Sequence, residues 1–183
     1  MPHASFADTT TWLDADQLQP APSPAELDWL FDDGSLTRRL IALSGDAFSV
    51  TPLQESWQTL RSDECQALNV REGSVGWVRE VYLRGHGQPW VFARSVAPRS
   101  QLLESDLHMD ELGSRSLGEL LFSDQAFSRG PMQVCRYPRH WLPADVSAAE
   151  LWARRSCFSR DGLGVLVAEV FLPALWAAAD AAV

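Results

Sequence analysis

The feature that most constrains the fold is a β-hairpin predicted over residues 75–98. Its sequence is VGWVREVYLRGHGQPWVFARSVAP, two runs rich in Val, Trp, Tyr and Phe that are joined by a loop containing Gly and Pro. Side chains alternate between the two faces of a strand, so Arg79 shares its face with apolar neighbours, and so does Arg94 on the second strand. Each strand therefore carries one arginine in the middle of an otherwise apolar face.

A third predicted strand, residues 164–172 (GVLVAEVFL), repeats this arrangement with the opposite charge, because Glu169 is the polar member of its face. A charge in a dry interior is costly unless it has a partner. If the three faces line one cavity, Arg79, Arg94 and Glu169 suit a small, flat, anionic organic ligand. The structural alternative is that one arginine forms an ion pair with Glu169, or that one face is solvated.

The composition excludes several classes of chemistry. The chain has 183 residues, which favours one domain, and 46% of them are hydrophobic. Its net charge is −9, and its fifteen cationic side chains are all arginines. The absence of lysine excludes Schiff-base catalysis. An acidic chain without a basic cluster argues against a nucleic-acid partner.

The sequence shows no pattern for a metal, for a thiol or serine nucleophile, or for export. The three cysteines are widely spaced, and the four histidines lack ligand spacing, so no metal site is expected. A G-x-S-x-G motif is absent, which argues against a serine hydrolase. No signal segment and no membrane-length apolar run is visible. We therefore expect a cytoplasmic protein without stable membrane insertion.

Turn and capping signals divide the chain into an irregular N-terminal segment (1–22), one domain (23–173) and an Ala-rich tail (174–183) that we expect to fray. Serines at positions suited to helix capping predict short helices after Ser23 and Ser35. The polar stretch 61–74 reads as a connecting loop.

Further strands are predicted over residues 48–60, with Pro52 marking an edge or a bulge, and over 127–137. Asp161-Gly162 predicts a tight hairpin turn between residues 151–160 and the Glu169 strand. These signals indicate an α+β protein with about six antiparallel strands and short helices segregated to one face or edge.

The turn at Ser116-Leu117-Gly118 opens another predicted helix. The N–H groups at a helix N-terminus can bind an anion, so a carboxylate could bind here. The alternative is an ordinary helix cap.

Several stretches, in the right order between residues 27 and 173, together resemble the chorismate lyase family. They are LDWL (27–30), SLTRR (35–39), WVREV (77–81), PWVFARSV (89–96), LG (112–113), LG and LF (117–118 and 121–122), WARRS (152–156) and AEVFLP (168–173). Each piece alone is weak, whereas the ordered set is specific.

The resemblance implies a lyase that converts chorismate to 4-hydroxybenzoate and pyruvate at the start of ubiquinone synthesis, without metal or organic cofactor. It also implies a typically monomeric protein whose ligand lies buried beneath helical flaps. In this chain, Arg79 would hold the ring carboxylate together with the backbone N–H of Leu117. Glu169 would meet the ring hydroxyl, and Leu36 would lie on a flap.

Chorismate is a dianion, and one guanidinium can bind a carboxylate through two parallel hydrogen bonds. Arg94 is our candidate for the enolpyruvyl carboxylate. Glu169 either orients the ring hydroxyl or acts as a general base. Because the groups that hold the substrate also hold the aromatic product, slow release and product inhibition are expected, with the flap around Leu36 as the gate.

Two other functions are compatible with the residues. One is a non-enzymatic domain that binds an aromatic acid, as in the effector domains of some bacterial regulators, whose fold is related. Those proteins carry a basic winged helix ahead of the domain, whereas an irregular segment precedes the first predicted helix here. The other is a hydrolase or thioesterase, for which no nucleophile–base pair is visible.

Overall fold

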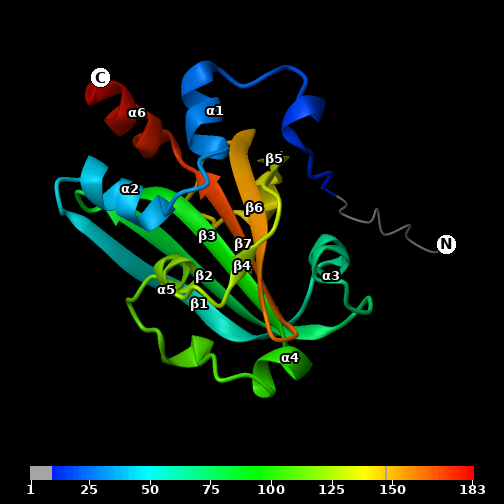
Figure 1. The fold of residues 1–183 in the computed structure, drawn as a ribbon. Coiled ribbons are helices and arrows are strands. Elements are labelled where there is room, and N and C mark those ends of the chain that lie inside the picture. The colour runs from blue at the N-terminus through cyan, green and yellow to red at the C-terminus, as the bar shows by residue number, and fades with distance from the viewer. Residues whose placement is uncertain (1–9, 147) are drawn as a thin grey trace.

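The computed structural model describes residues 10–146 and 148–183. Within them, seven strands form one antiparallel sheet in the order β1-β2-β3-β7-β6-β4, and β5 also pairs with β6 (Figure 1). The strands are β1 (Phe48–Thr59), β2 (Val75–Gly85), β3 (Gln88–Pro98), β4 (Ser128–Arg129), β5 (Gln133–Tyr137), β6 (Leu151–Arg160) and β7 (Leu163–Phe171). The predicted α+β fold is confirmed. The expected strand 127–137 is divided into β4 and β5.

The hairpin turns follow the predicted chemistry. His86 and Gly87 join β2 to β3 with positive φ angles of 50° and 76°, and Asp161 and Gly162 join β6 to β7 with 47° and 83°. Two consecutive residues at positive φ are typical of the turn that matches the twist of paired strands. The predicted irregularity at Pro52 is also present, as a register shift between Pro52 and Gln54.

Short helices flank the sheet. They are α1 (Pro24–Leu30), α2 (Leu36–Leu43), α3 (Ser62–Leu68), α4 (Arg99–Leu103), α5 (Leu117–Ser123) and α6 (Pro173–Ala181), with 3-10 turns at Ala15–Gln17, Met109–Glu111 and Arg139–Trp141. The hydroxyls of Ser23, Ser35 and Ser116 cap α1, α2 and α5, as predicted. Helices α2 and α5 contact each other and lie over one face of the sheet, in front of it in Figure 1.

The expectation that residues 61–74 form only a loop was wrong, because α3 spans Ser62–Leu68. This helix buries Cys65 and Leu68, but it also buries Asp63 and Glu64, which accept hydrogen bonds from arginines of the sheet. A helix that turns its carboxylates inward does not show the usual pattern of apolar residues. Its polar sequence therefore resembled a loop.

Both ends of the chain are more ordered than expected. The Ala-rich tail forms α6, which begins at Pro173 and buries Leu175 completely. Alanine has the highest helix propensity, and Ala174, Trp176, Ala178 and Ala179 pack against the core beside Leu175, which together hold this short helix. Near the other end, Leu13 pairs with Val134, and Leu18 is buried in the core. Residues 1–9, the remainder of the expected irregular segment, lie outside the described residues.

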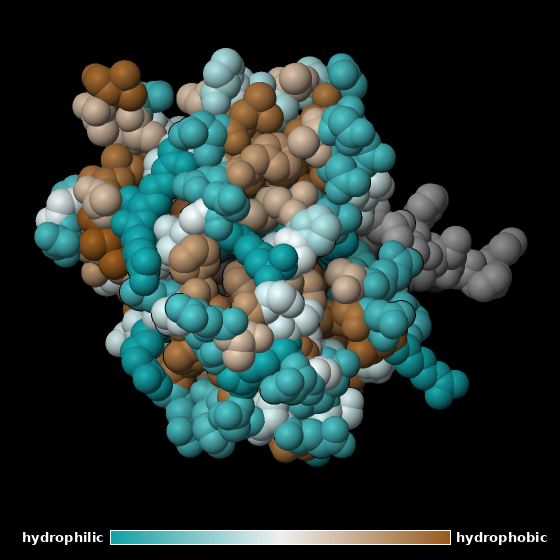
Figure 2. Space-filling view, viewed as in Figure 1, coloured by the Kyte–Doolittle hydropathy of each residue, from teal (hydrophilic) through white to brown (hydrophobic). Residues whose placement is uncertain are grey.

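In the space-filling view, hydrophilic side chains cover much of the face on which α2 and α5 lie, and the Ala-rich α6 forms the tan and brown projection at the upper left (Figure 2). Among the described residues, no helix has both the length and the apolar character needed to cross a membrane.

Candidate active site

The sheet register decides which of the predicted site residues face one another. Ala93 of β3 pairs with Val81 of β2 on one side and with Glu169 of β7 on the other. Paired residues point to the same face, and Arg79 lies two residues from Val81. Arg79 and Glu169 therefore share one face, where they are only 2% and 8% exposed. The structure thus brings these two residues onto one buried surface, as the sequence predicted.

Arg79 is held by protein groups on three sides. It forms an ion pair with Glu55 on β1 and donates hydrogen bonds of 2.8 Å to the carbonyl oxygens of Gly113 and Arg115. These three bonds use three of the five N–H groups of the guanidinium, so two remain for a ligand. The two carbonyls belong to the segment that leads into α5. Arg79 therefore also fixes the position of Leu117, the buried first residue of that helix.

Glu169 pairs with an arginine that the sequence analysis did not single out. The Nε of Arg154 on β6 donates to Glu169 Oε2 at 2.7 Å. The same guanidinium donates through Nη1 to the carbonyl oxygens of Trp29 (3.1 Å) and Asp32 (2.9 Å), in and just after α1. Arg154 is 1% exposed. A buried ion pair thus joins Glu169 to the chain that leads into α2.

A signal for Arg154 was present in the sequence. Arg154 lies directly opposite Glu169 in the β6/β7 pairing that the Asp161-Gly162 turn sets. Counting residues back from that turn would have brought the two together.

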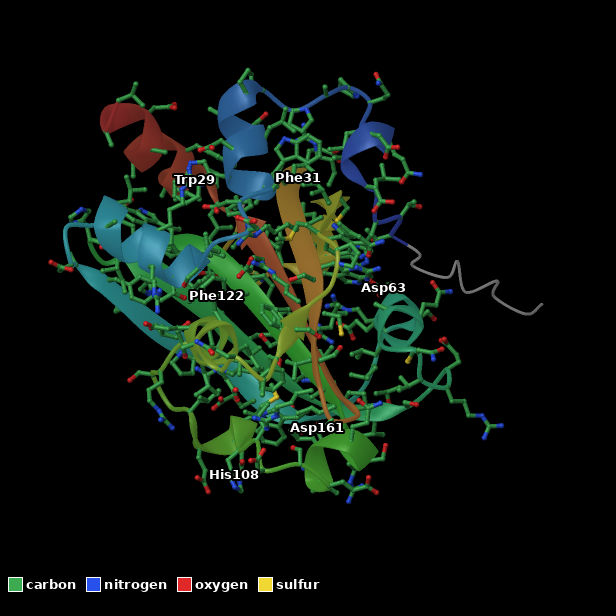
Figure 3. All side chains as sticks on the ribbon, viewed as in Figure 1. Trp29, Phe31, Asp63, His108, Phe122 and Asp161 are labelled. Carbon is green, nitrogen blue, oxygen red and sulfur yellow. The ribbon has the colours of Figure 1, made fainter. Side chains whose placement is uncertain are left out.

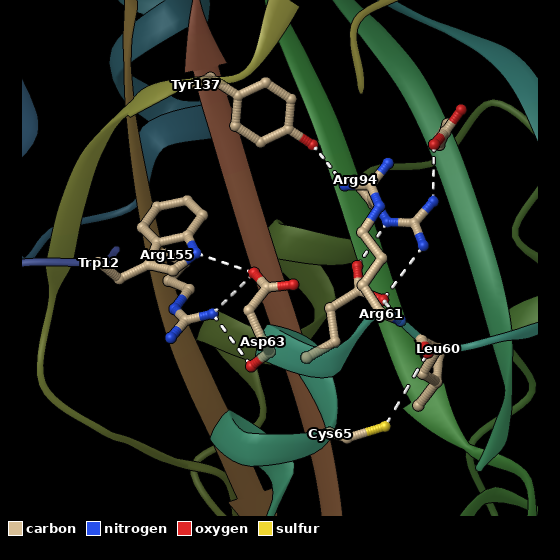
Figure 4. Close-up of polar contacts among 10 residues, drawn as sticks. Trp12, Leu60, Arg61, Asp63, Cys65, Arg94, Tyr137 and Arg155 are labelled. Atoms are coloured by element: carbon tan, nitrogen blue, oxygen red, sulfur yellow. Dashed lines mark hydrogen bonds and ion pairs between the residues drawn. The ribbon is translucent and has the colours of Figure 1, made fainter. Parts of the chain in front are cut away.

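The expectation that Arg94 shares a cavity with Arg79 was wrong. Arg94 pairs with Glu80 in the register of β2 and β3, so it points to the opposite face (Figure 4). Its Nε and Nη2 donate to the two carboxylate oxygens of Glu64 on α3, at 2.6 and 3.1 Å, and its Nη1 donates to Glu80 at 2.8 Å. Alternation shows which residues of one strand share a face. Matching faces between strands needs the register as well.

The surroundings of Arg94 form a closely packed polar network beneath α3 (Figure 4). Asp63 accepts hydrogen bonds from Trp12 (2.9 Å) and Arg155 (3.3 Å), and the Tyr137 hydroxyl accepts one from Arg61 (3.0 Å). The free volume among these side chains is about 10 Å³, the space of about one water molecule. The network around Arg94 therefore leaves no room for an organic ligand.

Helices α2 and α5 meet where each begins. The Thr37 and Ser116 hydroxyls form a 2.8 Å hydrogen bond between the first turn of α2 and the cap of α5. Leu36, the first residue of α2, is buried and packs in the core together with Leu40. This contact holds the starts of α2 and α5 together over the face that carries Arg79.

Other chemically active side chains lie apart from this face. Among the described residues, no group of three or more His, Cys, Asp and Glu side chains is placed to hold a metal ion. Burial raises the pKa values of Cys65, Cys135 and Cys157, which disfavours their thiolate forms. His108 lies at the end of the molecule near α4 (Figure 3).

Comparison with known proteins agrees with this geometry. The family model described as chorismate lyase matches residues 6–181. The chain belongs to the chorismate lyase family. Two relatives, each named "Probable chorismate pyruvate-lyase", illustrate the likeness. The one from Pseudomonas fluorescens Pf-5 is 66% identical over 182 residues, which cover 99% of this chain and 97% of the relative. The one from Pseudomonas aeruginosa PAO1 is 68% identical over 165 residues, covering 90% and 92%.

More distant solved structures share the fold of this chorismate lyase family member. The C-terminal domain of PhnF superposes with a TM-score of 0.55 at 14% identity, covering 68% of this chain and 82% of that one. A protein described as a transcriptional regulator from Streptomyces coelicolor gives 0.51 at 15% identity, covering 69% and 87%. At this identity the likeness concerns the fold alone.

Proposed function

We propose that this chain is a cofactor-independent carbon–oxygen lyase that converts chorismate to 4-hydroxybenzoate and pyruvate, the first committed step of ubiquinone synthesis. The observation that carries the proposal is the family match over nearly the whole chain. The placement of Arg79 and Glu169 on one buried face agrees with it. Their strands, β2 and β7, are two positions apart in the sheet, or about 10 Å. A para-substituted benzoate ring has polar groups separated on that scale.

At one end of the ring, Arg79 binds the ring carboxylate through the N–H groups that the protein leaves free. The backbone N–H of Leu117 donates to the same carboxylate, because the first N–H groups of a helix have no acceptor within it. The Glu55 ion pair and the two carbonyls hold the guanidinium in place before the ligand arrives. Such preorganisation lowers the cost of binding.

At the other end, Glu169 accepts a hydrogen bond from the ring hydroxyl. Arg154 already holds its Oε2, which leaves Oε1 for the substrate. In the reaction, the bond between the ring carbon and the enolpyruvyl oxygen breaks, and the neighbouring ring carbon loses its proton. That proton passes to the methylene carbon of the leaving enolpyruvyl group, which becomes the methyl group of pyruvate. The remaining ring is aromatic, so the protein mainly holds the reacting geometry and excludes water.

The flaps account for the expected product inhibition. 4-Hydroxybenzoate keeps both the carboxylate and the hydroxyl that Arg79, Leu117 and Glu169 bind, so it leaves slowly. Its release requires the flap that carries Leu36 to separate from α5. We further propose that the enzyme acts as a monomer in the cytoplasm and binds no nucleic acid. The alternative of a non-enzymatic sensor domain has only the shared fold in its favour.

The test is to incubate the purified protein with chorismate alone. Pyruvate is followed by coupled NADH oxidation, and 4-hydroxybenzoate is measured by chromatography. The two products should form in equal amounts, and Arg79→Ala should remove most of the activity while the protein stays folded. A wild-type protein that releases neither product would refute the proposal.

A further inference from the structure

The proposed substrate has a second carboxylate, on the enolpyruvyl group, and Arg94 lies on the wrong face to bind it. Another arginine lies on the correct face. Arg129 of β4 pairs with Phe158 of β6, and its Nε donates to Ser156 Oγ at 2.9 Å. Ser156 is two residues from Arg154 on the same strand, so it points to the face that carries Glu169. Residues two apart in a strand are separated by about 7 Å, so the Cα of Ser156 lies about 7 Å along β6 from that of Arg154, which pairs with Glu169.

Arg129 differs from the other arginines on this face in its partners. Arg79 and Arg154 each pair with a carboxylate. Among the described residues, Arg129 has no carboxylate within ion-pair distance. Its guanidinium contacts the Ser156 hydroxyl, the Asp33 carbonyl oxygen at 3.3 Å and, at 4.0 Å, the Met132 sulfur.

The environment of Arg129 favours binding of an anion. Burial lowers the pKa of its guanidinium, and the Glu169 carboxylate partly opposes this effect. An arginine remains charged at neutral pH even so. A half-buried charge without a counterion gains more from an incoming carboxylate than an exposed one does.

Arg129 lines a pocket of about 310 Å³ between the end of α1 and α5. Phe31 directly follows α1 and Phe122 lies on α5, and both rings line this pocket (Figure 3). The other apolar lining side chains are Leu121, Phe127, Met132 and Phe158. A three-carbon acid fits this volume, and its methylene end would meet apolar walls.

We infer that Arg129 binds the enolpyruvyl carboxylate of the substrate and that pyruvate forms in the pocket beside it; this inference rests on the proposed function. The three residues then lie on different strands of the sheet order β2-β3-β7-β6-β4, each beside one polar group of the substrate. Arg79 holds the ring carboxylate, Glu169 the hydroxyl, and Arg129 the side chain that leaves. The aromatic product lacks that side chain, so Arg129 distinguishes substrate from product.

Arg129→Gln tests this assignment. Loss of one charge-assisted interaction should lower kcat/KM for chorismate about 10- to 100-fold. The Kd of 4-hydroxybenzoate, measured by calorimetry, should change less than about twofold, because that ligand does not reach Arg129. Arg129→Lys keeps the charge but loses the planar guanidinium, so its kcat/KM for chorismate should lie between those of the wild type and Arg129→Gln. The matched control is Arg136→Gln on β5, an exposed arginine outside the site, for which both quantities should stay at wild-type values.

Two results would overturn the inference. If Arg129→Gln weakens the binding of 4-hydroxybenzoate as much as it lowers kcat/KM for chorismate, Arg129 only connects the turn at Asp33 to the sheet. If Arg129→Gln changes neither of these two quantities, Arg129 does not bind the substrate. Failure of the proposed function looks different: the wild-type protein would then form no pyruvate from chorismate, whatever residue occupies position 129.

Discussion

Glu169 can be assigned one of two roles from its contacts. It is 8% exposed, and Arg154 holds one of its two oxygens. A residue that only orients the ring hydroxyl needs a hydrogen-bonding group beside it, whereas a general base needs a carboxylate that takes up a proton. Arg154 donates to Oε2 and so fixes the orientation of the carboxylate, which suits a stationary hydrogen-bond partner. We therefore expect the orienting role.

Glu169→Gln removes the base but keeps a hydrogen-bonding group beside the ring hydroxyl, because its oxygen stays with Arg154 and its amide N–H can donate to the hydroxyl oxygen. We expect kcat to fall less than about 100-fold, because general-base catalysis contributes roughly 10²- to 10⁴-fold. Single-turnover measurement with chorismate separates the chemical step from product release. If Glu169→Gln loses all turnover but still binds 4-hydroxybenzoate, Glu169 acts as a general base. The matched control is Glu104→Gln, an exposed residue after α4.

At the scale of elements, two ion pairs, Glu64–Arg94 and Asp63–Arg155, hold α3 on the sheet. Glu64 and Arg94 are about 5% exposed each, and two hydrogen bonds join them. Removing the Glu64 charge leaves the buried Arg94 guanidinium with Glu80 as its only carboxylate partner among the described residues, and leaves two of its N–H groups poorly matched. Glu64→Gln should therefore lower the free energy of unfolding by about 3 kcal/mol. Urea unfolding checks this, with Glu104→Gln expected within about 0.5 kcal/mol of wild type. An equal, small effect of both changes would show that the pair contributes little.

The contact between α2 and α5 should govern product release. Thr37→Val keeps the shape of the side chain but removes the 2.8 Å hydrogen bond to Ser116. A net hydrogen bond contributes about 1 kcal/mol, so the flaps should open several-fold more often. We expect 4-hydroxybenzoate to dissociate several-fold faster in stopped-flow measurements. Thr59→Val, at an exposed position on β1, should leave the dissociation rate unchanged. An unaltered rate in Thr37→Val would mean that the product leaves by another route.

The sequence predicted elements better than it predicted their relation to one another. Capping serines and the Asp161-Gly162 turn act within a few residues, so their signals are local and the structure confirms them. The face of Arg94 depends on the pairing of β2 with β3, where a register shift between Leu83 and Arg84 precedes the turn. Helix α3 depends on arginines of distant strands. Long-range pairing of this kind leaves little trace in a short window of sequence.

For the molecule as a whole, the buried charged side chains play different roles on the two faces of the sheet. Under α3, acidic and basic side chains form ion pairs with one another and leave almost no free volume. Under α2 and α5, Arg79 and Arg129 keep N–H groups free, and Arg129 lacks a carboxylate among the described residues. A protein that must bind a dianion can leave positive charge uncompensated on one face only if the rest of the fold is stable without it.

The two tyrosines of the chain report on this stability at alkaline pH. Burial raises the pKa of Tyr137 to about 12, and burial together with a hydrogen bond to Asp145 raises that of Tyr82 further. An unfolded tyrosine titrates near pH 10. Since the folded pKa values lie above the unfolded ones, this contribution to stability is complete below about pH 10 and is lost as the pH rises toward and beyond 12.

Phenolate absorbance near 295 nm should therefore stay low in the native protein up to about pH 11 and rise near pH 10 in urea. The free energy of unfolding should fall over the same alkaline range. Tyr137→Phe removes one of the two native titrations and should flatten that fall, because a phenylalanine has no proton to lose. A native tyrosine that ionises near pH 10 would contradict the buried position of that ring.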